Sequence, residues 1–186
     1  MKKIHLSLIS IAITLGSCTT KTDPFEIAPN HIGNLTKTTQ VSELDEIYKN
    51  DSIVKRVAGD EFIGNPNEIE VYDKQGNKLL VLETTQEYDS TATIKSVRVI
   101  DPRFKTDKGF GASSTFKDLK DNYTIKKITN TLSVAFISVE ELNIDIAINK
   151  KELPKELLFD TKSKIEPVQI PDTAKLKYFW LDWDKN

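Results

Sequence analysis

The sequence predicts an α+β protein in which short helices pack on a mostly antiparallel sheet. Residues 38–48 and 115–123 each place their apolar side chains on one helical face, with charged side chains on the other. Each stretch is followed by segments typical of strands, separated by Asn, Asp, Gly and Pro. We therefore expect two helix-plus-antiparallel-meander repeats, packed as helices on one sheet.

The chain opens with a leader that ends at its single cysteine. Two lysines precede the apolar run 4–15, which is too short to span a bilayer as a helix and is typical of an export signal. The closing motif Leu15-Gly16-Ser17-Cys18 resembles a bacterial lipobox. That resemblance implies cleavage before Cys18 and attachment of diacylglycerol and palmitate chains to it. The alternatives are a secreted protein with an incidental cysteine and a buried free thiol.

The leader sets the expected domain organisation. We expect residues 1–17 to be removed, and residues 18–31, which include Pro24 and Pro29, to hold the lipidated cysteine and a flexible tether. Residues 32–186 should form a single globular domain. Two or more acyl chains anchor a protein stably, so the membrane is an expected partner through Cys18. This predicts a lipid-anchored protein of the bacterial cell envelope, with the outer membrane favoured and the leaflet left open.

Charge and composition exclude several partners. Two of the 26 basic residues lie in the leader, so the mature chain carries 24 basic against 28 acidic residues. No basic cluster is dense enough to indicate nucleic acid binding. With Cys18 lipidated, no cysteine is left for disulfides, and His31 is the only histidine outside the leader. We therefore expect no metal and no cofactor.

The first half of the chain shows one helix pattern and then strands. Val41, Leu44, Ile47 and Tyr48 form the apolar stripe of the helix expected over 38–48. The strand segments follow it, at 68–72, 78–84 and 94–101, and residues 73–77 form a turn between the first two.

The second half repeats this order. A Gly-rich and Ser-rich turn over 109–115 opens the second helix, in which Phe116, Leu119 and Tyr123 share one face. The later segments comprise strands at 131–139 and 142–148, a short helix at 152–159, and strands at 165–170 and 176–183.

A shift of 75 residues superposes the two helix patterns. Leu44 then falls on Leu119, and Tyr48 falls on Tyr123. This predicts tandem repeats over 32–107 and 108–186, against the alternative of chance similarity between two amphipathic helices.

A Gly-rich turn, a helix with Leu-x-x-x-Tyr and a meander resemble the repeat of small envelope proteins over about residues 32–150. The SmpA/OmlA outer-membrane assembly lipoproteins and the β-lactamase-inhibitor-like fold are examples. The chain is equally similar to uncharacterised lipoproteins of Bacteroidota. These resemblances imply an envelope role for the domain.

No catalytic residues stand out. Gly109-Phe110-Gly111 lacks the third glycine of a dinucleotide site and the Gly-Lys-Ser/Thr of a phosphate loop. The clustered carboxylates are Glu83, Glu87 and Asp89; Glu140 and Glu141; and Asp182 and Asp184. Nothing in the sequence pairs them across a substrate, and there is no nucleophile–base signature, so we do not expect an enzyme.

The segment 178–183, Tyr-Phe-Trp-Leu-Asp-Trp, is the most unusual in the chain. As a strand it places Tyr178 and Trp180 on one face and Trp183 on the other. Apolar groups on both faces predict a central or covered strand. The alternative is an aromatic patch for a protein or glycan partner, with Tyr178, Trp180 and Trp183 as its candidate residues.

These observations favour a membrane-anchored envelope lipoprotein that is a non-enzymatic protein-binding or scaffold module, with an envelope protein as partner. The alternative is a periplasmic inhibitor or immunity protein, and a glycan- or peptide-acting enzyme ranks third. The sequence leaves the oligomeric state open.

Overall fold

The computed structural model describes residues 23–55 and 68–184, and this part of the chain is mostly β-structure. Its two α-helices are short, with α1 at Leu44–Ile47 and α2 at Phe116–Asn122, while the strands form a sheet of eight and a sheet of four. The predicted α+β class, with helix-on-sheet repeats, is therefore wrong. Helices this short contribute little surface to a core, so the strands dominate it.

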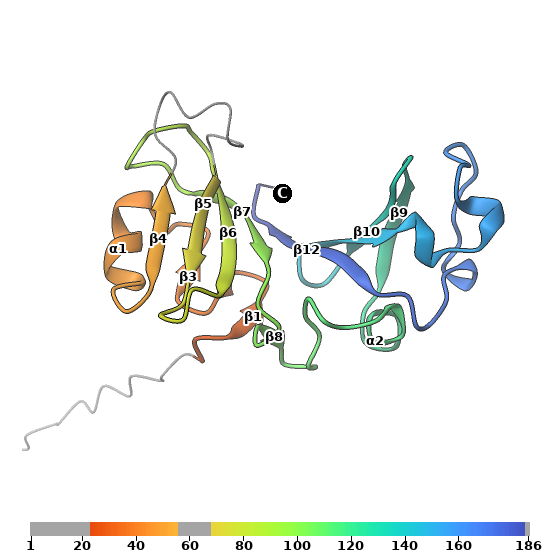
Figure 1. Ribbon diagram of the computed structural model, residues 1–186, viewed down its shortest axis with the longest axis horizontal. Coiled ribbons are helices and arrows are strands. Elements are labelled where there is room, and N and C mark those ends of the chain that lie inside the picture. Colours follow the sequence, from red (N-terminus) through yellow and green to blue (C-terminus); the bar gives the residue numbers. More distant parts are fainter. Residues whose placement is uncertain (1–22, 56–67, 185–186) are drawn as a thin grey trace, which may run out of the picture.

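The large sheet contains eight antiparallel strands. In spatial order they are β4 (Ser52–Lys55), β5 (Glu68–Tyr72), β6 (Lys78–Thr84), β7 (Ile94–Val99), β12 (Leu176–Asp182), β11 (Ile144–Asn149), β10 (Val134–Val139) and β9 (Ile125–Asn130). Two meanders thus meet where β7 pairs with β12, at the middle of the sheet (Figure 1). The prediction that 176–183 forms a central strand is confirmed.

The small sheet joins the beginning of the domain to its middle. Its order is β3 (Leu35–Thr36), β2 (His31–Ile32), β1 (Glu26–Ala28) and β8 (Lys105–Thr106), with β1 parallel to β8. Residues 26–31, expected in the flexible tether, are therefore held in the fold. The Arg103 guanidinium also lies 4.5 Å from the Phe25 ring centre, which fixes the chain one residue before β1.

The core lies on one face of the large sheet. Phe110, Phe116 and Phe179 are buried together with the inward residues of the strands, and the Phe110 and Phe179 rings lie 5.5 Å apart. Leu44 and Leu119 are fully buried, and Tyr48 and Tyr123 directly follow α1 and α2. These local parallels do not restore the helix-on-sheet repeats, and the division of the domain into residues 32–107 and 108–186 stays a prediction.

The expected helix over 38–48 is reduced to its last turn. Gln40 pairs with Thr93 as an isolated bridge, and the Val41 N–H donates to the Ala92 carbonyl. Backbone groups that bond to a neighbouring segment are lost to the helix, so residues 41–43 form a 3-10 turn before α1.

Two later predictions are corrected in the same way. The helix expected at 152–159 is replaced by 3-10 turns at Lys150–Glu152 and Lys155–Leu157, because Pro154 between them has no N–H to donate. The strand expected at 165–170 contains the 3-10 turn Pro167–Gln169. Within the described ranges, no helix has the length and hydropathy needed to cross a bilayer.

Candidate functional site

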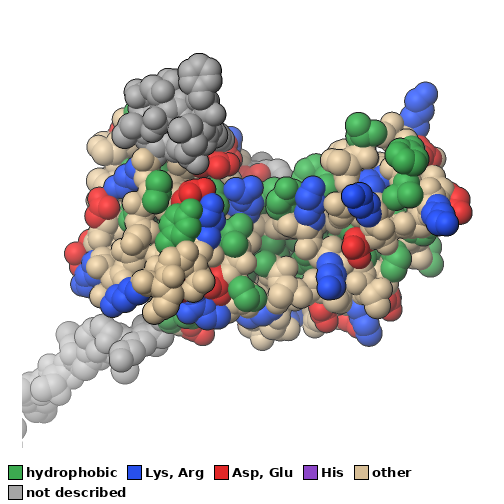
Figure 2. Space-filling model, in the orientation of Figure 1, with side chains coloured by type: hydrophobic (Ala, Val, Ile, Leu, Met, Phe, Trp, Pro, Cys, Tyr) green, Lys and Arg blue, Asp and Glu red, His purple; other side chains and the backbone are tan. Residues whose placement is uncertain are grey.

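The face of the large sheet that points away from the core carries a broad hollow of about 950 Å³. Its lining comes from β6, β7, β12, β11, β10 and β9, with the turn between β10 and β11. Figure 2 shows the molecule hollowed between the two ends of the sheet, with hydrophobic side chains along the depression. An open face of this kind is normally polar, so its apolar content marks the hollow as a candidate site.

Strand register arranges this face in three rows that run across the strands. The aromatic row comprises Phe136, Ala147 and Tyr178; the central row comprises Arg98, Trp180, Asp145 and Ser138; and the acidic row comprises Glu83, Ser96 and Asp182. Neighbouring residues in a row lie on adjacent strands, about 4.8 Å apart. Trp180 therefore lies between the aromatic and the acidic rows.

The aromatic side chains form one connected group. The Trp180 ring centre lies 5.0 Å from that of Tyr178 and 5.9 Å from that of Phe136. Phe136 and Tyr178 keep 37% and 36% of their surface exposed, whereas Ala147 between them is fully buried. The small side chain on β11 lets the larger rings lean over it, and this produces an exposed apolar ridge.

Arg98 borders the ridge on the β7 side. Its guanidinium lies 6.0 Å from the Tyr178 ring centre and 3.9 Å from a Glu68 carboxylate oxygen. The Nε atom is buried and has no hydrogen-bond partner among the described residues. Arg98 thus holds the Tyr178 ring from one side and leaves one donor unused.

Two carboxylates of the hollow, those of Glu83 and Asp145, are engaged with neighbouring hydroxyl and amine groups. The Ser96 hydroxyl donates to Glu83 at 3.1 Å, and the Lys95 amine lies 3.5 Å from the same carboxylate. The Ser138 hydroxyl donates to Asp145 at 2.6 Å. No described group of three or more His, Cys, Asp or Glu side chains is placed to hold a metal ion.

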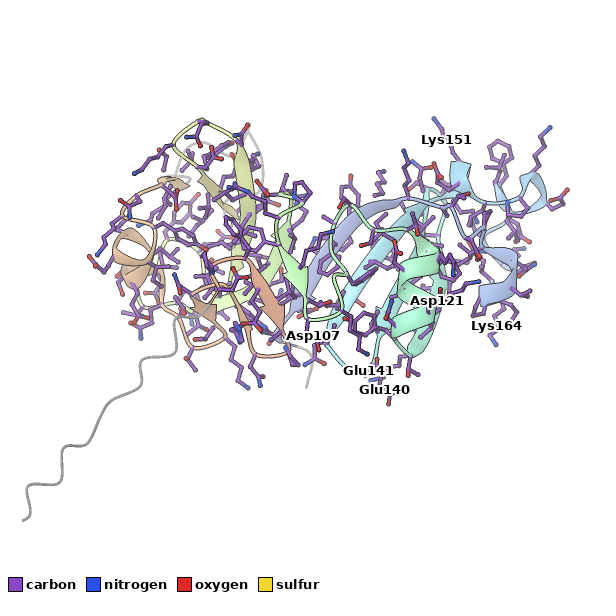
Figure 3. The ribbon with its side chains drawn as sticks, turned by 90° about the horizontal axis from the view of Figure 1, so that it is seen from below. Asp107, Asp121, Glu140, Glu141, Lys151 and Lys164 are labelled. Atoms are coloured by element: carbon purple, nitrogen blue, oxygen red, sulfur yellow. The ribbon has the colours of Figure 1, made fainter. Side chains whose placement is uncertain are left out.

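Other carboxylates singled out by the sequence have local structural roles. Glu140 and Glu141 lie at the turn between β10 and β11 (Figure 3), and only Glu140 lines the hollow. The Thr124 N–H donates to Glu141, which lowers the pKa of that carboxyl. Asp89 accepts from the Thr91 N–H and hydroxyl, and these bonds lower its pKa as well. Both groups stabilise turns.

The structure separates the three candidate aromatic residues. Tyr178 and Trp180 lie on the outer face, within the hollow or at its border, whereas Trp183 is 7% exposed and belongs to the core. Cys18 lies outside the described residues. Phe136 was missed, although it alternates with the buried Ala135 and Ile137 and could have been assigned to the outer face.

Gly109-Phe110-Gly111 forms a packed turn and not a phosphate cradle. Gly109 has a φ of +75°, and the Phe110 side chain is buried in the core. A Cβ at Gly111 would lie 2.3 Å from the Phe104 carbonyl oxygen, so the glycine is required by this close backbone approach.

Comparison with known proteins yields a fold but no activity. No protein family and no curated protein matches the chain. Among solved structures, it is similar to the crystal structure of the uncharacterized protein yfeY from Escherichia coli, with a TM-score of 0.51 and 16% identity. The match covers 84% of this chain and 99% of the other. The two proteins share a fold.

Proposed function

We propose that this protein is a membrane-anchored binding module of the cell envelope, which captures a partner protein in the hollow of the large sheet and performs no chemistry. The observation that carries this proposal is the ridge on the solvent face of the sheet, in which the exposed Phe136 and Tyr178 pack against the half-buried Trp180. Aromatic side chains of this kind are enriched at the centres of protein interfaces.

The lipobox-like motif supports the anchored part of the proposal. If Cys18 carries the lipid, six residues connect it to Phe25, which Arg103 holds against the domain. The seven steps from Cys18 to Phe25 span at most about 24 Å, at roughly 3.4 Å per step. β1 lies on the side of the large sheet opposite the hollow (Figures 1 and 2). A short connection at β1 would therefore leave the hollow accessible to a partner.

Site-specific photo-crosslinking in the producing bacterium tests the proposal. Thr129 is exposed on β9 and lines the hollow, so a photoreactive amino acid at this position would contact a bound partner. Asp121 on α2 is the matched control, because α2 lies in front when the molecule is seen from below (Figure 3), on the side away from the hollow.

We expect a protein adduct from position 129 and none from position 121, with the adduct lost in the Tyr178→Ser variant. Equal adducts at both positions, or none at position 129, would contradict a binding role of the hollow. A hydrolase activity that stays with the protein through purification would contradict the non-enzymatic part.

A further inference from the structure

Resting on that proposed function, we infer that the hollow recognises a partner segment which presents a Lys or Arg side chain four residues from an apolar side chain in an extended conformation. The cationic side chain would lie over the acidic row and the apolar side chain over the aromatic row. The inference combines the charge of the hollow with the spacing of its rows.

The charge of the hollow favours a cationic group. Four carboxylates line it, from Glu83, Glu140, Asp145 and Asp182, against the two lysines Lys126 and Lys127. Both lysines lie on β9, which is about 14 Å from β12 and about 10 Å from β11 at 4.8 Å per strand. On the β7 side of the sheet, Lys95 offsets the charge of Glu83, and Arg98 offsets the charge of Glu68. Beside Trp180, the middle of the hollow carries the carboxylates of Asp145 and Asp182, and it also carries Arg98, whose guanidinium lies against the Tyr178 ring and the Glu68 carboxylate.

The spacing of the rows sets the distance between the two recognised side chains. Tyr178, Trp180 and Asp182 follow one another at every second position of β12 and face the same side. Tyr178 and Asp182 are thus about 13 Å apart along the strand, at roughly 3.3 Å per residue. Residues i and i+4 of an extended segment laid along β12 span the same distance.

Ring geometry favours a protein segment over a sugar. A glycan-binding platform offers an open ring face on which a pyranose stacks. Here the Trp180 ring contacts the Tyr178 and Phe136 rings at 5.0 and 5.9 Å, with tilts of 44° and 36°. The rings lean on one another and form a ridge, which suits an apolar side chain or the stem of a lysine.

Binding of short peptides to the mature, lipidated chain in detergent micelles tests the inference. The probe is a blocked peptide, Gly-Lys-Ser-Thr-Ser-Phe-Gly, and its analogues replace Lys by Glu or Phe by Ser. The readout is the pair of indole N–H signals of the protein labelled with ¹⁵N at tryptophan. Trp180 lies in the hollow, and Trp183 in the core is an internal control.

We expect the Lys–Phe peptide to shift the Trp180 signal and leave the Trp183 signal unchanged. The Glu analogue should bind about tenfold more weakly, which corresponds to roughly 1.4 kcal/mol. Asp182→Asn and Asp145→Asn should each weaken binding severalfold, while Asp121→Asn on α2 should not. Two independent carboxamide variants are used because either one alone could disturb folding, which the Trp183 signal would report.

Equal binding of the Lys and Glu peptides, or no shift of Trp180 with any peptide, would overturn the inference. A shift caused by a chito-oligosaccharide and by no peptide would overturn it in favour of a glycan. Protein adducts at position 129 without a preference for the Lys peptide would retain the proposed function and reject only this inference.

Discussion

The rings of Phe136 and Trp180 lie 5.9 Å apart although β11 separates the two strands that carry them. Phe136 on β10 pairs with Ala147 on β11, and Trp180 on β12 pairs with Asp145 on β11. The two aromatic residues therefore lie two strands apart and diagonally across β11, and the small Ala147 leaves room for them to meet over it. The contact creates the ridge on which the proposed binding role depends.

Truncation of Trp180 should affect binding more than stability. Trp180 is half-buried on the outer face, so Trp180→Ala should lower the free energy of unfolding by about 1 to 2 kcal/mol. Phe179→Ala empties a fully buried site beside Phe110 and should cost about 3 to 5 kcal/mol. Urea denaturation of both variants checks the contrast. A Trp180→Ala variant as unstable as Phe179→Ala would place Trp180 in the core.

The first turn of α2 depends on its capping box. The Thr115 hydroxyl accepts from the Asp118 N–H, and the Thr115 N–H donates to the Asp118 carboxylate at 2.7 Å. Thr115→Ala should destabilise the protein by about 1 kcal/mol because a helix N–H loses its partner. Thr115→Ser, which retains the hydroxyl, is the control and should unfold near the wild-type urea concentration.

The Asp101–Arg103 pair should make the stability of the protein decrease as the pH becomes acidic. The Arg103 guanidinium donates to both Asp101 carboxylate oxygens at 2.9 Å, and this pairing holds the pKa of Asp101 below its usual value. The contribution of this pair to the free energy of unfolding is therefore present above the pKa of an unfolded Asp, about 4. It is lost as the pH falls through the lower pKa of Asp101 in the folded protein.

Asp101→Asn should lower the free energy of unfolding at pH 7 by about 1 to 3 kcal/mol. The difference from the wild type should shrink as the pH falls through the lowered pKa of Asp101, because the wild-type carboxyl then also becomes neutral. Urea titrations at a series of pH values from 7 downward measure it, and a difference independent of pH would contradict the role of the charge.

The buried amine of Lys150 should stabilise the loop after the 3-10 turns. Lys150 is 3% exposed, and its amine donates to the Asn130 side-chain oxygen and to the Asp160 carbonyl at 2.7 Å. Lys150→Met leaves both acceptors without this donor and should cost about 1 to 3 kcal/mol. The exposed neighbour Lys151 provides the control, since Lys151→Met should change stability by less than about 0.5 kcal/mol.

The lipobox-like motif predicts the fate of a Cys18→Ser variant. Serine offers no thiol for the lipid, so the protein should lose palmitate labelling and keep its leader. Metabolic labelling and the mass of the purified chain measure both effects. Cys18→Ser protein that is still cleaved before position 18 would indicate an ordinary secreted protein.

Local patterns in the sequence were enough to locate several strands of the large sheet. The segments 68–72 and 78–84 coincide with β5 and β6, and the alternation over 176–183 places Phe179 and Trp180 on opposite faces, as the structure does. The alternation of apolar and polar residues indicates which face of a strand is buried, and this pattern lies within the sequence of the strand itself. The charge and the single cysteine are likewise read directly from the chain.

Tertiary structure decided the pairing and the extent of the helices. The N-terminal half of the expected helix 38–48 bonds to residues 90–94 instead, and β12 joins β7 in the middle of the sheet. Both depend on contacts between distant segments, which local periodicity does not encode. The same long-range register brings Phe136, Trp180 and Asp145 into one hollow. The sequence by itself thus predicted a leader and determined which side chains share a face of a strand, and only the tertiary structure decided which of those faces meet to form a site.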